Sequence, residues 1–311
     1  MGLPVYIVIV NYREWQDVKE CLESIFQSHY TDYKVFVVDN DSGNNSLEQL
    51  MKWMDSSDLK TDRPIHKKYY AGAEFLNEIP LQDLPELVLV QNAENRGFAA
   101  GNNKVLRHLL NQDAYVWLLN PDMVVESNTM SELLRFAKDP PRRSVIGAVV
   151  KYYSNPDRIH FYGGARINFN TATIVPVVKP EDVHMLDYIG GGSLFVHAGH
   201  FKELGLLPEN YFLYWEETDW CYHAKQKGFA MLVCPTAICY DKISTSIGKS
   251  YLADYYYTLN GLTFISKYKK NRLPIVMSAA LLRFMKRILT GQWSRSKGVM
   301  NGIVNFIKRK S

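Results

Sequence analysis

The chain has 311 residues, of which 47% are hydrophobic and 13% aromatic, so it contains enough apolar material for a buried core and is not a disordered protein. No stretch approaches the roughly eighteen consecutive apolar residues that a spanning helix needs, which argues against an integral membrane protein. The net charge is only +4, residues 1–266 are acidic and no nucleic-acid-binding module is recognisable, so we expect no nucleic-acid partner.

Targeting and redox features indicate the cytoplasm. The segment from Met1 to Val10 contains neither a basic leader nor a small-residue cleavage site, so we expect no signal peptide. The four cysteines are scattered and form no C-x-x-C pair, which favours reduced, buried thiols over disulfides or a zinc site. We therefore predict a cytoplasmic protein.

Strands and helices alternate in the first 120 residues. Continuous β-branched runs predict buried strands, and apolar residues at helical spacing predict the helices between them. The strands are expected at 5–10, 34–38, 87–90 and 115–119, and the helices at 17–27 and 102–110. Residues 55–86 form a polar excursion without a clear pattern. Because strand, helix and strand in this order make a βαβ unit, the expected fold class is α/β, with a Rossmann-like, mostly parallel central sheet flanked by helices.

Polar side chains follow these strands, where the carboxyl ends of a parallel sheet form a ligand-binding crevice. Asp39 and Asn40 come after the second strand and could hydrogen-bond a base or a ribose, although the same residues are ordinary turn composition. Asn120 and Asp122 flank a proline after the fourth strand. Their oxygen atoms suit Mg²⁺ or Mn²⁺ shared with substrate phosphates, and a plain loop explains this local pattern equally well.

The most informative stretch places three carboxylates among aromatic residues. Glu216, Glu217 and Asp219 fall within four positions of one another, so like charges repel and apolar neighbours desolvate them. A carboxylate whose pKa is raised in this way is suited to general-base catalysis. The alternative is a solvated, acidic start of a helix.

Three consecutive glycines precede Ser193 and allow the backbone to approach a bound group closely. Neither the G-x-G-x-x-G spacing of dinucleotide-binding folds nor a G-x-x-x-x-G-K-[ST] loop occurs in the sequence. Phosphate must therefore be bound in another way.

Six segments, in their order along the chain, resemble family 2 inverting glycosyltransferases of the GT-A fold. They are particularly similar to the bacterial rhamnosyltransferase-like branch, which builds surface polysaccharides. The resemblance extends from Val5 to about Lys267. It is carried by Ile7–Tyr12 (IVIVNY), Val37–Ser42 (VVDNDS), Glu94–Asn103 (ENRGFAAGNN), Leu118–Asp122 (LLNPD), Gly190–Ser193 (GGGS) and Leu213–Asp219 (LYWEETD).

The resemblance implies a nucleoside diphosphate sugar donor and a divalent metal. Asn11 and Asp39 would hold the base and the ribose. Asp122 would bind the Mg²⁺ or Mn²⁺ that bridges the diphosphate, acting as a Lewis acid as the nucleoside diphosphate leaves, and Asn120 occupies the first position of what is often an Asp-x-Asp pair. The other donor-binding residues that it implies are Asn40, Asn95, Arg96, Gly97, Asn102, Asn103 and Asn120.

The resemblance also implies the catalytic residues. Glu217 would deprotonate an acceptor hydroxyl, with Glu216 and Asp219 positioning it, and a single displacement would invert the anomeric carbon. The residues that would face the acceptor are Gly191, Gly192, Ser193 and Trp215.

Three positions depart from the family pattern. Asp241 stands where relatives often have a histidine, and because a carboxylate can ligate a hard cation we include it in the metal site. His223 and Leu259 each replace an arginine that is usual in relatives. Two lost cations imply altered donor contacts, weaker diphosphate binding or reduced activity, although a protonated His223 would replace one of them in part.

The C-terminal segment has a composition of its own. Residues 267–311 contain twelve Lys or Arg and no acid, with bulky apolar residues interleaved at helical spacing, as in interfacial helices. We therefore divide the chain into a GT-A domain at 1–266 and a basic, amphipathic, helical membrane-binding tail at 267–311. The alternative is a helix that packs on its own domain.

These observations predict an enzyme that transfers a hexose from a UDP- or dTDP-sugar to a lipid-linked or surface-polysaccharide glycan. It would associate peripherally with the inner face of the plasma membrane, binding anionic lipid through 267–311. A dTDP-rhamnose donor is suggested by the resemblance alone, and the sequence predicts no particular oligomeric state. The alternative is a catalytically weak GT-A scaffold in a glycan-assembly complex. A sugar nucleotidyltransferase is disfavoured because no glycine-rich loop follows Val10.

Overall fold

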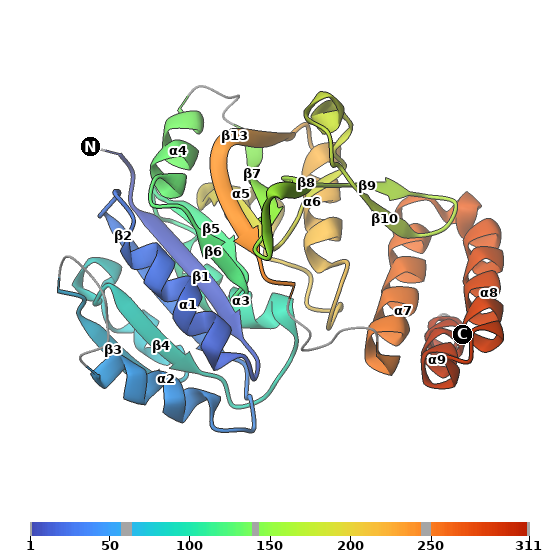
Figure 1. Cartoon of the computed structure of the whole chain (residues 1–311), viewed down its shortest axis with the longest axis horizontal. Coiled ribbons are helices and arrows are strands. Elements are labelled where there is room, and N and C mark those ends of the chain that lie inside the picture. Colours follow the sequence, from blue (N-terminus) through green and yellow to red (C-terminus); the bar gives the residue numbers. More distant parts are fainter. Residues whose placement is uncertain (1, 57–63, 139–142, 244–249, 310–311) are drawn as a thin grey trace.

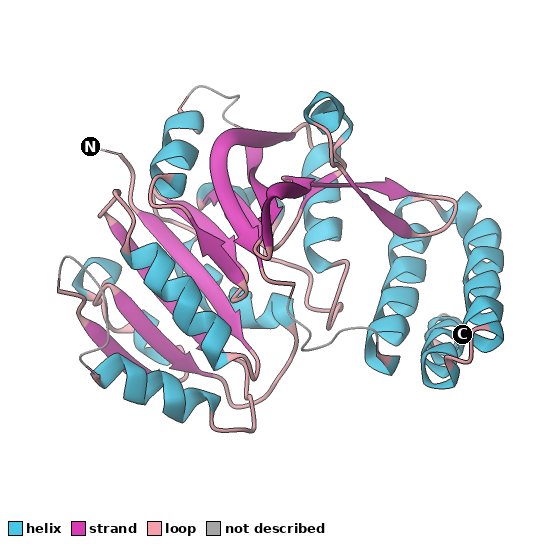
Figure 2. Cartoon of the chain, viewed as in Figure 1, coloured by secondary structure: helices cyan, strands magenta, loops and turns pink. Residues whose placement is uncertain are grey.

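The computed structural model describes residues 2–56, 64–138, 143–243 and 250–309, and it has a mixed α/β architecture with helices gathered at the C-terminus (Figures 1 and 2). The strands are β1 Val5–Asn11, β2 Tyr33–Asp39, β3 Lys67–Ala71, β4 Leu87–Gln91, β5 Tyr115–Leu119, β6 Met123–Val125, β7 Ser144–Tyr152, β8 Asn155–Tyr162, β9 Gly164–Asn168, β10 Thr173–Pro176, β11 Tyr188–Ile189, β12 Ser193–His197 and β13 Ala230–Asp241. The α-helices are α1 Trp15–Phe26, α2 Ser46–Asp55, α3 Phe98–Leu109, α4 Thr129–Phe136, α5 Gly199–Leu204, α6 Glu216–Gln226, α7 Tyr251–Tyr268, α8 Leu273–Leu289 and α9 Trp293–Lys308.

Ten of the described strands form the central sheet, in the order β3-β4-β2-β1-β5-β12-β7-β13-β6 with β8 beside β7. Strands β1 to β5 are parallel to one another, and their register brings Asn11, Asp39 and Gln91 side by side at the carboxyl ends of β1, β2 and β4. The predicted strands and the mostly parallel sheet of the first half are therefore confirmed. The polar residues that follow these strands lie along one edge.

Alternate residues of β1 face two hydrophobic layers, as the period of a strand requires. Val5, Ile7 and Ile9 pack with residues of α1, α2 and α4, whereas Tyr6 and Val8 pack with residues of α3, α5 and α6. All five are buried. This burial on both faces explains the uninterrupted β-branched sequence of the strand.

The second half of the sheet contains pairings that the sequence analysis did not identify. Strand β12 runs antiparallel between β5 and β7, which places Ser193 opposite Leu119 at the carboxyl end of β5. The polar excursion at 55–86 contributes the edge strand β3, whose side chains are partly or fully exposed, as is usual at a sheet edge. Three short strands form a separate sheet in the order β10-β9-β11.

Helices α7, α8 and α9 pack against one another at one end of the molecule (Figure 1). Helix α9 approaches α7 closely because Gly298 and Gly302 lie at the contact. A Cβ atom on Gly298 would lie 2.4 Å from the carbonyl oxygen of Tyr251, and one on Gly302 would lie 2.8 Å from that of Tyr255. The domain boundary expected at residue 266 falls inside α7. Within the described residues, no helix has the length and apolar character needed to cross a membrane.

This close contact predicts an unusual effect of Gly298→Ala. At an exposed position of a helix, replacing glycine by alanine stabilises the folded protein by about 1 kcal/mol, because alanine is the better helix former. Here the added methyl group meets backbone, so we expect a loss of about 1–3 kcal/mol in the free energy of unfolding, measured by urea denaturation. Ser294→Ala, at an exposed position of α9, is the control and should be neutral or stabilising. A stabilised Gly298→Ala protein would contradict the packing of α9 on α7.

Candidate active site

Asn11 and Asp39 meet at the carboxyl ends of neighbouring strands. The Asn11 amide Nδ2 donates to Asp39 Oδ2 at 2.6 Å and to Ser42 Oγ at 3.3 Å. Ser42 in turn donates through its hydroxyl and its backbone N–H to the two oxygens of Asp39, at 2.7 and 3.1 Å. All three residues are buried, so this network fixes the orientation of the Asp39 carboxylate.

A second network joins the loops after β2 and β4. Asn40 Nδ2 donates to Asn95 Oδ1 at 2.9 Å and to the carbonyl oxygen of Gly97 at 3.1 Å, while Asn92 Nδ2 donates to Asn40 Oδ1 at 3.0 Å. Gly97 has φ of 89°, and a Cβ there would lie 2.1 Å from the carbonyl oxygen of Phe212. Only glycine fits at this position, where the loop touches the segment before α6. Asn92 was not predicted, and its place directly after β4 is the signal that could have identified it.

The later residues of the same motif serve the fold. Asn103 Nδ2 donates to the carbonyl oxygen of Leu207 and to Glu209, and Asn103 Oδ1 accepts from the N–H of Leu207. Through these hydrogen bonds Asn103 fastens the loop at 205–209 to α3, and its contact with the donor stays a prediction. Asn102 donates to Phe98 within α3, and Arg96 lies 3.6 Å from Glu94. The donor contacts of Asn102 and Arg96 stay predictions.

The three glycines at 190–192, here called the glycine loop, lie between the end of β5 and the start of α6. The N–H of Asn120 donates to the carbonyl oxygen of Gly192 at 3.1 Å, and a Cβ on Gly191 would lie 3.3 Å from Cγ of Glu217. Asn120 thus contacts this loop at Gly192, and the side chain of Glu217 lies against it at Gly191. Ser193 is buried and its hydroxyl accepts from Trp117 Nε1 at 3.0 Å, and its contact with an acceptor stays a prediction.

Asp122 and Asp241 come from adjacent chain segments. Asp241 ends β13 and pairs with Met123 of β6, and the N–H of Lys242 donates to the carbonyl oxygen of Asp122 at 3.1 Å. Asp241 Oδ2 lies 3.0 Å from His160 Nδ1, a histidine that reaches the site from β8 and was not predicted. Among the described residues no cluster of three or more His, Cys, Asp or Glu could hold a metal by itself. Two carboxylates fit a hard cation that takes its other ligands from a diphosphate.

The start of α6 is held by an unusual turn. Tyr214 and Trp215 have φ of 64° and 78°, in the left-handed region that side chains disfavour. Asn260 of α7 donates through Nδ2 to the carbonyl oxygens of Leu213 and Tyr214, at 2.8 and 3.1 Å. Trp215 is 2% exposed and packs over Gly261, and its contact with an acceptor stays a prediction. Asn260 therefore has a role in the site that its sequence context did not reveal.

The two glutamates at the start of α6 differ in environment. Glu216 is 3% exposed, and burial followed by the charge of Glu217 raises its pKa well above the usual range. Glu217 is partly exposed, and burial raises its pKa, while the backbone N–H groups of Glu217, Thr218 and Gly191 act in the opposite direction. The pKa of both glutamates is thus raised by burial, and Glu217 is the more exposed of the two.

The carboxylate of Asp219 is bound by residues outside the start of α6. It accepts from Tyr211 at 2.8 Å and from Lys267 at 2.7 Å, and it also accepts from Tyr268. These contacts tie α6 to the end of α7. Asp219 thus helps to fix the position of α6, and among the described residues no hydrogen bond joins it to Glu217.

The sequence of this chain matches a known protein family. Residues 6–186 match the model of the glycosyl transferase family 2. The chain belongs to this family. It is 23% identical over 241 residues to the low-salt glycan biosynthesis hexosyltransferase Agl10 of Haloferax volcanii, which corresponds to 73% of this chain and 64% of that protein. The chain therefore spans less than two thirds of the length of that relative.

Solved structures of glycosyltransferases share the fold. The mannosyltransferase PcManGT from Pyrobaculum calidifontis, in complex with GDP-Man and Mn²⁺, matches with a TM-score of 0.60 and 14% identity, covering 100% of this chain and 89% of that one. TarS of S. aureus, residues 1–349 with UDP-GlcNAc, matches with a TM-score of 0.58 and 12% identity, covering 98% and 81%. The GT-A fold expected from the resemblance is confirmed.

One departure of this family 2 glycosyltransferase from the usual pattern has a structural reason. Leu259 is 1% exposed in α7, and its backbone N lies 3.2 Å from the position of a Cβ on Gly302 of α9. An arginine at residue 259 would place a cation in this apolar contact between helices, which is unfavourable without a partner. The structure offers no comparable explanation for His223, which lies in the last turn of α6.

Proposed function

We propose that this family 2 glycosyltransferase is a metal-dependent inverting enzyme that transfers a hexose from a nucleoside diphosphate sugar to a hydroxyl group of a glycan. The observation that carries the proposal is the placement of Glu217. This partly exposed carboxylate with a raised pKa lies against Gly191, across the glycine loop from Asn120. The name of the relative Agl10, a hexosyltransferase of glycan biosynthesis, supports a hexose as the transferred group.

Glu217 would act as the general base. As the acceptor oxygen attacks the anomeric carbon, its proton passes to the Glu217 carboxylate, and the bond between that carbon and the nucleoside diphosphate breaks. One displacement of this kind inverts the configuration. Neutral Glu216 beside it would keep the local negative charge at one, so that Glu217 can ionise.

Asp39 and Asn11 would bind the nucleoside of a UDP- or dTDP-sugar. The Asp39 carboxylate is held by Asn11 and Ser42 and can accept from a ribose hydroxyl or a base N–H. Asp122 and Asp241 would hold Mg²⁺ or Mn²⁺, with His160 orienting Asp241. The metal supplies charge neutralisation at the diphosphate, and the bound Mn²⁺ in the structure of PcManGT supports this assignment.

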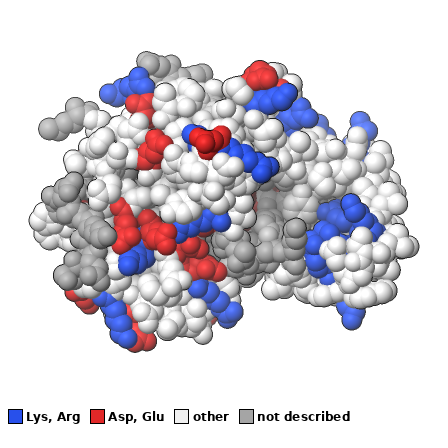
Figure 3. Space-filling model, viewed as in Figure 1, with Lys and Arg blue, Asp and Glu red and all other residues white. Residues whose placement is uncertain are grey.

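The C-terminal helices would bind an anionic membrane surface. The outer face of α8 and the start of α9 expose large apolar side chains, among them Leu282 (70%), Leu289 (81%) and Trp293 (62%). Exposed cations such as Lys286 and Lys297 accompany them. Figure 3 shows Lys and Arg but no acid on the visible face of this lobe. An apolar stripe flanked by cations complements a bilayer with anionic headgroups, and this supports a lipid-linked acceptor and a peripheral location at the inner face of the plasma membrane.

Substituting Glu217 tests the base. Glu217→Gln keeps the shape of the side chain but removes its basicity, so turnover should fall by about 10²- to 10⁴-fold while donor binding is retained. In the unsubstituted enzyme kcat/KM should rise with pH through a pKa above the usual glutamate value of about 4.3, because the ionised form is the active one. Glu181→Gln, an exposed glutamate, is the control. Unchanged turnover of Glu217→Gln would refute the role, whereas absent turnover in every form would favour the scaffold.

Substituting Asp122 tests the metal site. In Asp122→Ala the affinity for a UDP- or dTDP-sugar in the presence of Mn²⁺ should fall at least about 10-fold, because even residues that only support a metal ligand contribute that much. The measurement is titration calorimetry with and without Mn²⁺. Asp113→Ala changes an aspartate whose side chain is 83% exposed and should have no effect. Equal Mn²⁺-dependent affinity in the Asp122→Ala and unsubstituted proteins would exclude this assignment.

Two leucines test the membrane contact. The double substitution Leu282→Ser and Leu289→Ser should reduce co-sedimentation with phosphatidylglycerol vesicles by about 10-fold or more, because burial of each leucine contributes about 1.5–3 kcal/mol. Val178→Ser, at an exposed valine after β10, is the matched control. These substitutions test the apolar face alone. Deletion of 267–311 would also remove Lys267 and Tyr268, which donate to Asp219. Undiminished co-sedimentation of the double variant would rule out this face as the anchor.

A further inference from the structure

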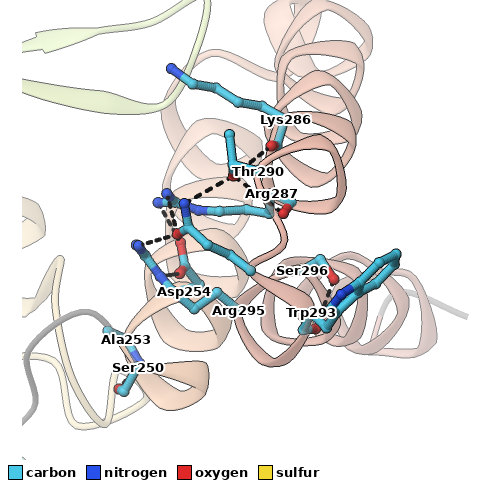
Figure 4. Close-up of polar contacts among 10 residues, drawn as sticks. Ser250, Ala253, Asp254, Lys286, Arg287, Thr290, Trp293, Arg295 and Ser296 are labelled. Carbon is cyan, nitrogen blue, oxygen red and sulfur yellow. Dashed lines mark hydrogen bonds and ion pairs between the residues drawn. The ribbon is translucent and has the colours of Figure 1, made fainter.

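Arginines of α8 and α9 gather around one carboxylate of α7 (Figure 4). Arg287 Nη2 lies 3.2 Å from Asp254 Oδ1, and Arg295 Nε lies 2.5 Å from Asp254 Oδ2. Both guanidinium groups also donate to Gln292 Oε1, at 3.1 and 2.6 Å. The side chain of Asp254 is 8% exposed, so these two ion pairs are largely withdrawn from water.

A third arginine leaves the positive charge of this cluster uncompensated. Arg283 lies one turn before Arg287 on α8, with its guanidinium 5.5 Å from the ring centre of Tyr257, and it forms no ion pair among the described residues. Burial lowers the pKa of Arg283, whereas the nearby Tyr257 and Asp254 raise it. Arg287 Nε is buried and has no hydrogen-bond acceptor in the described part of the chain. Three cations with one anion are unfavourable at a partly buried site unless a further anion binds.

This cluster lies between the catalytic turn and the apolar face of α8. The ring of Tyr257 is 6.0 Å from that of Tyr214, which belongs to the turn before α6. Burial, then the charges of Glu216, Asp254 and Glu217, raise the pKa of Tyr214, so Asp254 and Glu217 are both close to this tyrosine. Leu282 and Leu289 are exposed on the outer surface of α8, the helix that carries Arg283 and Arg287.

We propose that Arg283 and Arg287 bind the phosphate group of the lipid carrier to which the acceptor glycan is attached. This inference rests on the proposed function, in which the acceptor is a lipid-linked glycan. The sugar hydroxyl of such an acceptor would bind at Glu217, and its lipid-bound phosphate would lie at the bilayer. Guanidinium groups are suited to the task, since they stay charged and present several N–H donors to phosphate oxygens. Among the described residues, neither the Nε–H of Arg287 nor the guanidinium of Arg283 has a hydrogen-bond acceptor, so these donors are available to a phosphate. The donor diphosphate would lie elsewhere, at Asp122 and Asp241.

Binding of farnesyl phosphate to the full chain tests this site. Titrations are run in EDTA, so that metal-dependent binding at the donor site does not contribute. Arg283→Gln should weaken binding by about 10-fold, the effect of losing one charged hydrogen-bonding partner, whereas Arg283→Lys should retain part of the affinity. Lys138→Gln removes one exposed cation that follows α4, outside the C-terminal helices, and should change nothing. Circular dichroism and thermal unfolding confirm that each variant is folded.

Three outcomes separate the possibilities. Equal affinity of the unsubstituted protein and Arg283→Gln would overturn the inference. A parallel loss of binding to phosphatidylglycerol vesicles that contain no carrier would assign the cluster to phospholipid headgroups and overturn the carrier assignment. Arg283-dependent binding that persists in Asp122→Ala would support it. That result would hold even if no nucleotide sugar bound, so failure of the proposed function and failure of this inference are distinguishable.

Discussion

The left-handed turn at Tyr214 and Trp215 is the constraint on which the site depends. Such backbone conformations cost about 1–2 kcal/mol for each residue with a side chain. Two hydrogen bonds from Asn260 and the burial of the Trp215 ring against α7 offset this cost. Because the turn is fixed, α6 begins at Glu216, and Glu217 is directed at Gly191 while Glu216 is buried. A relaxed turn would rotate the start of α6 and separate the carboxylate from the glycine loop.

Helix α7 joins this turn to the C-terminal helices. Asn260 holds the turn, Lys267 and Tyr268 hold Asp219 of α6, and Asp254 pairs with arginines of α8 and α9. Gly298 and Gly302 of α9 allow the backbones of α7 and α9 to come into contact. The apolar face of α8 is therefore held at a fixed position relative to Glu217. If that face enters a bilayer, the height of the Glu217 carboxylate above the lipid is set by the fold.

Local sequence predicted the parallel strands and the polar residues at their ends, because β-branched runs and turn formers act over a few positions. It did not predict Asn92, His160 or Asn260, since each acts on a segment far away in the chain. The family motifs identified Ser193 and Trp215 but did not predict the direction of their side chains. Both side chains are buried against residues far away in the chain, Trp117 and Gly261. The unusual pairings of β12 and β13 likewise depend on contacts that no local pattern contains.

The composition of residues 267–311 admits two interpretations, packing on the enzyme or binding to membrane, and the structure shows that they are compatible. Helices α8 and α9 need an acid to pair with their inward arginines, and α7 supplies it as Asp254, which precedes the acid-free segment. Some cations are thus used within the protein, whereas others, such as Lys286 and Lys297, stay exposed beside apolar side chains. One face of the helices packs and the other is available for lipid. The absence of acids after residue 266 is compatible with both roles, because the acid that pairs with the inward arginines lies in α7 and the outer face combines cations with apolar side chains.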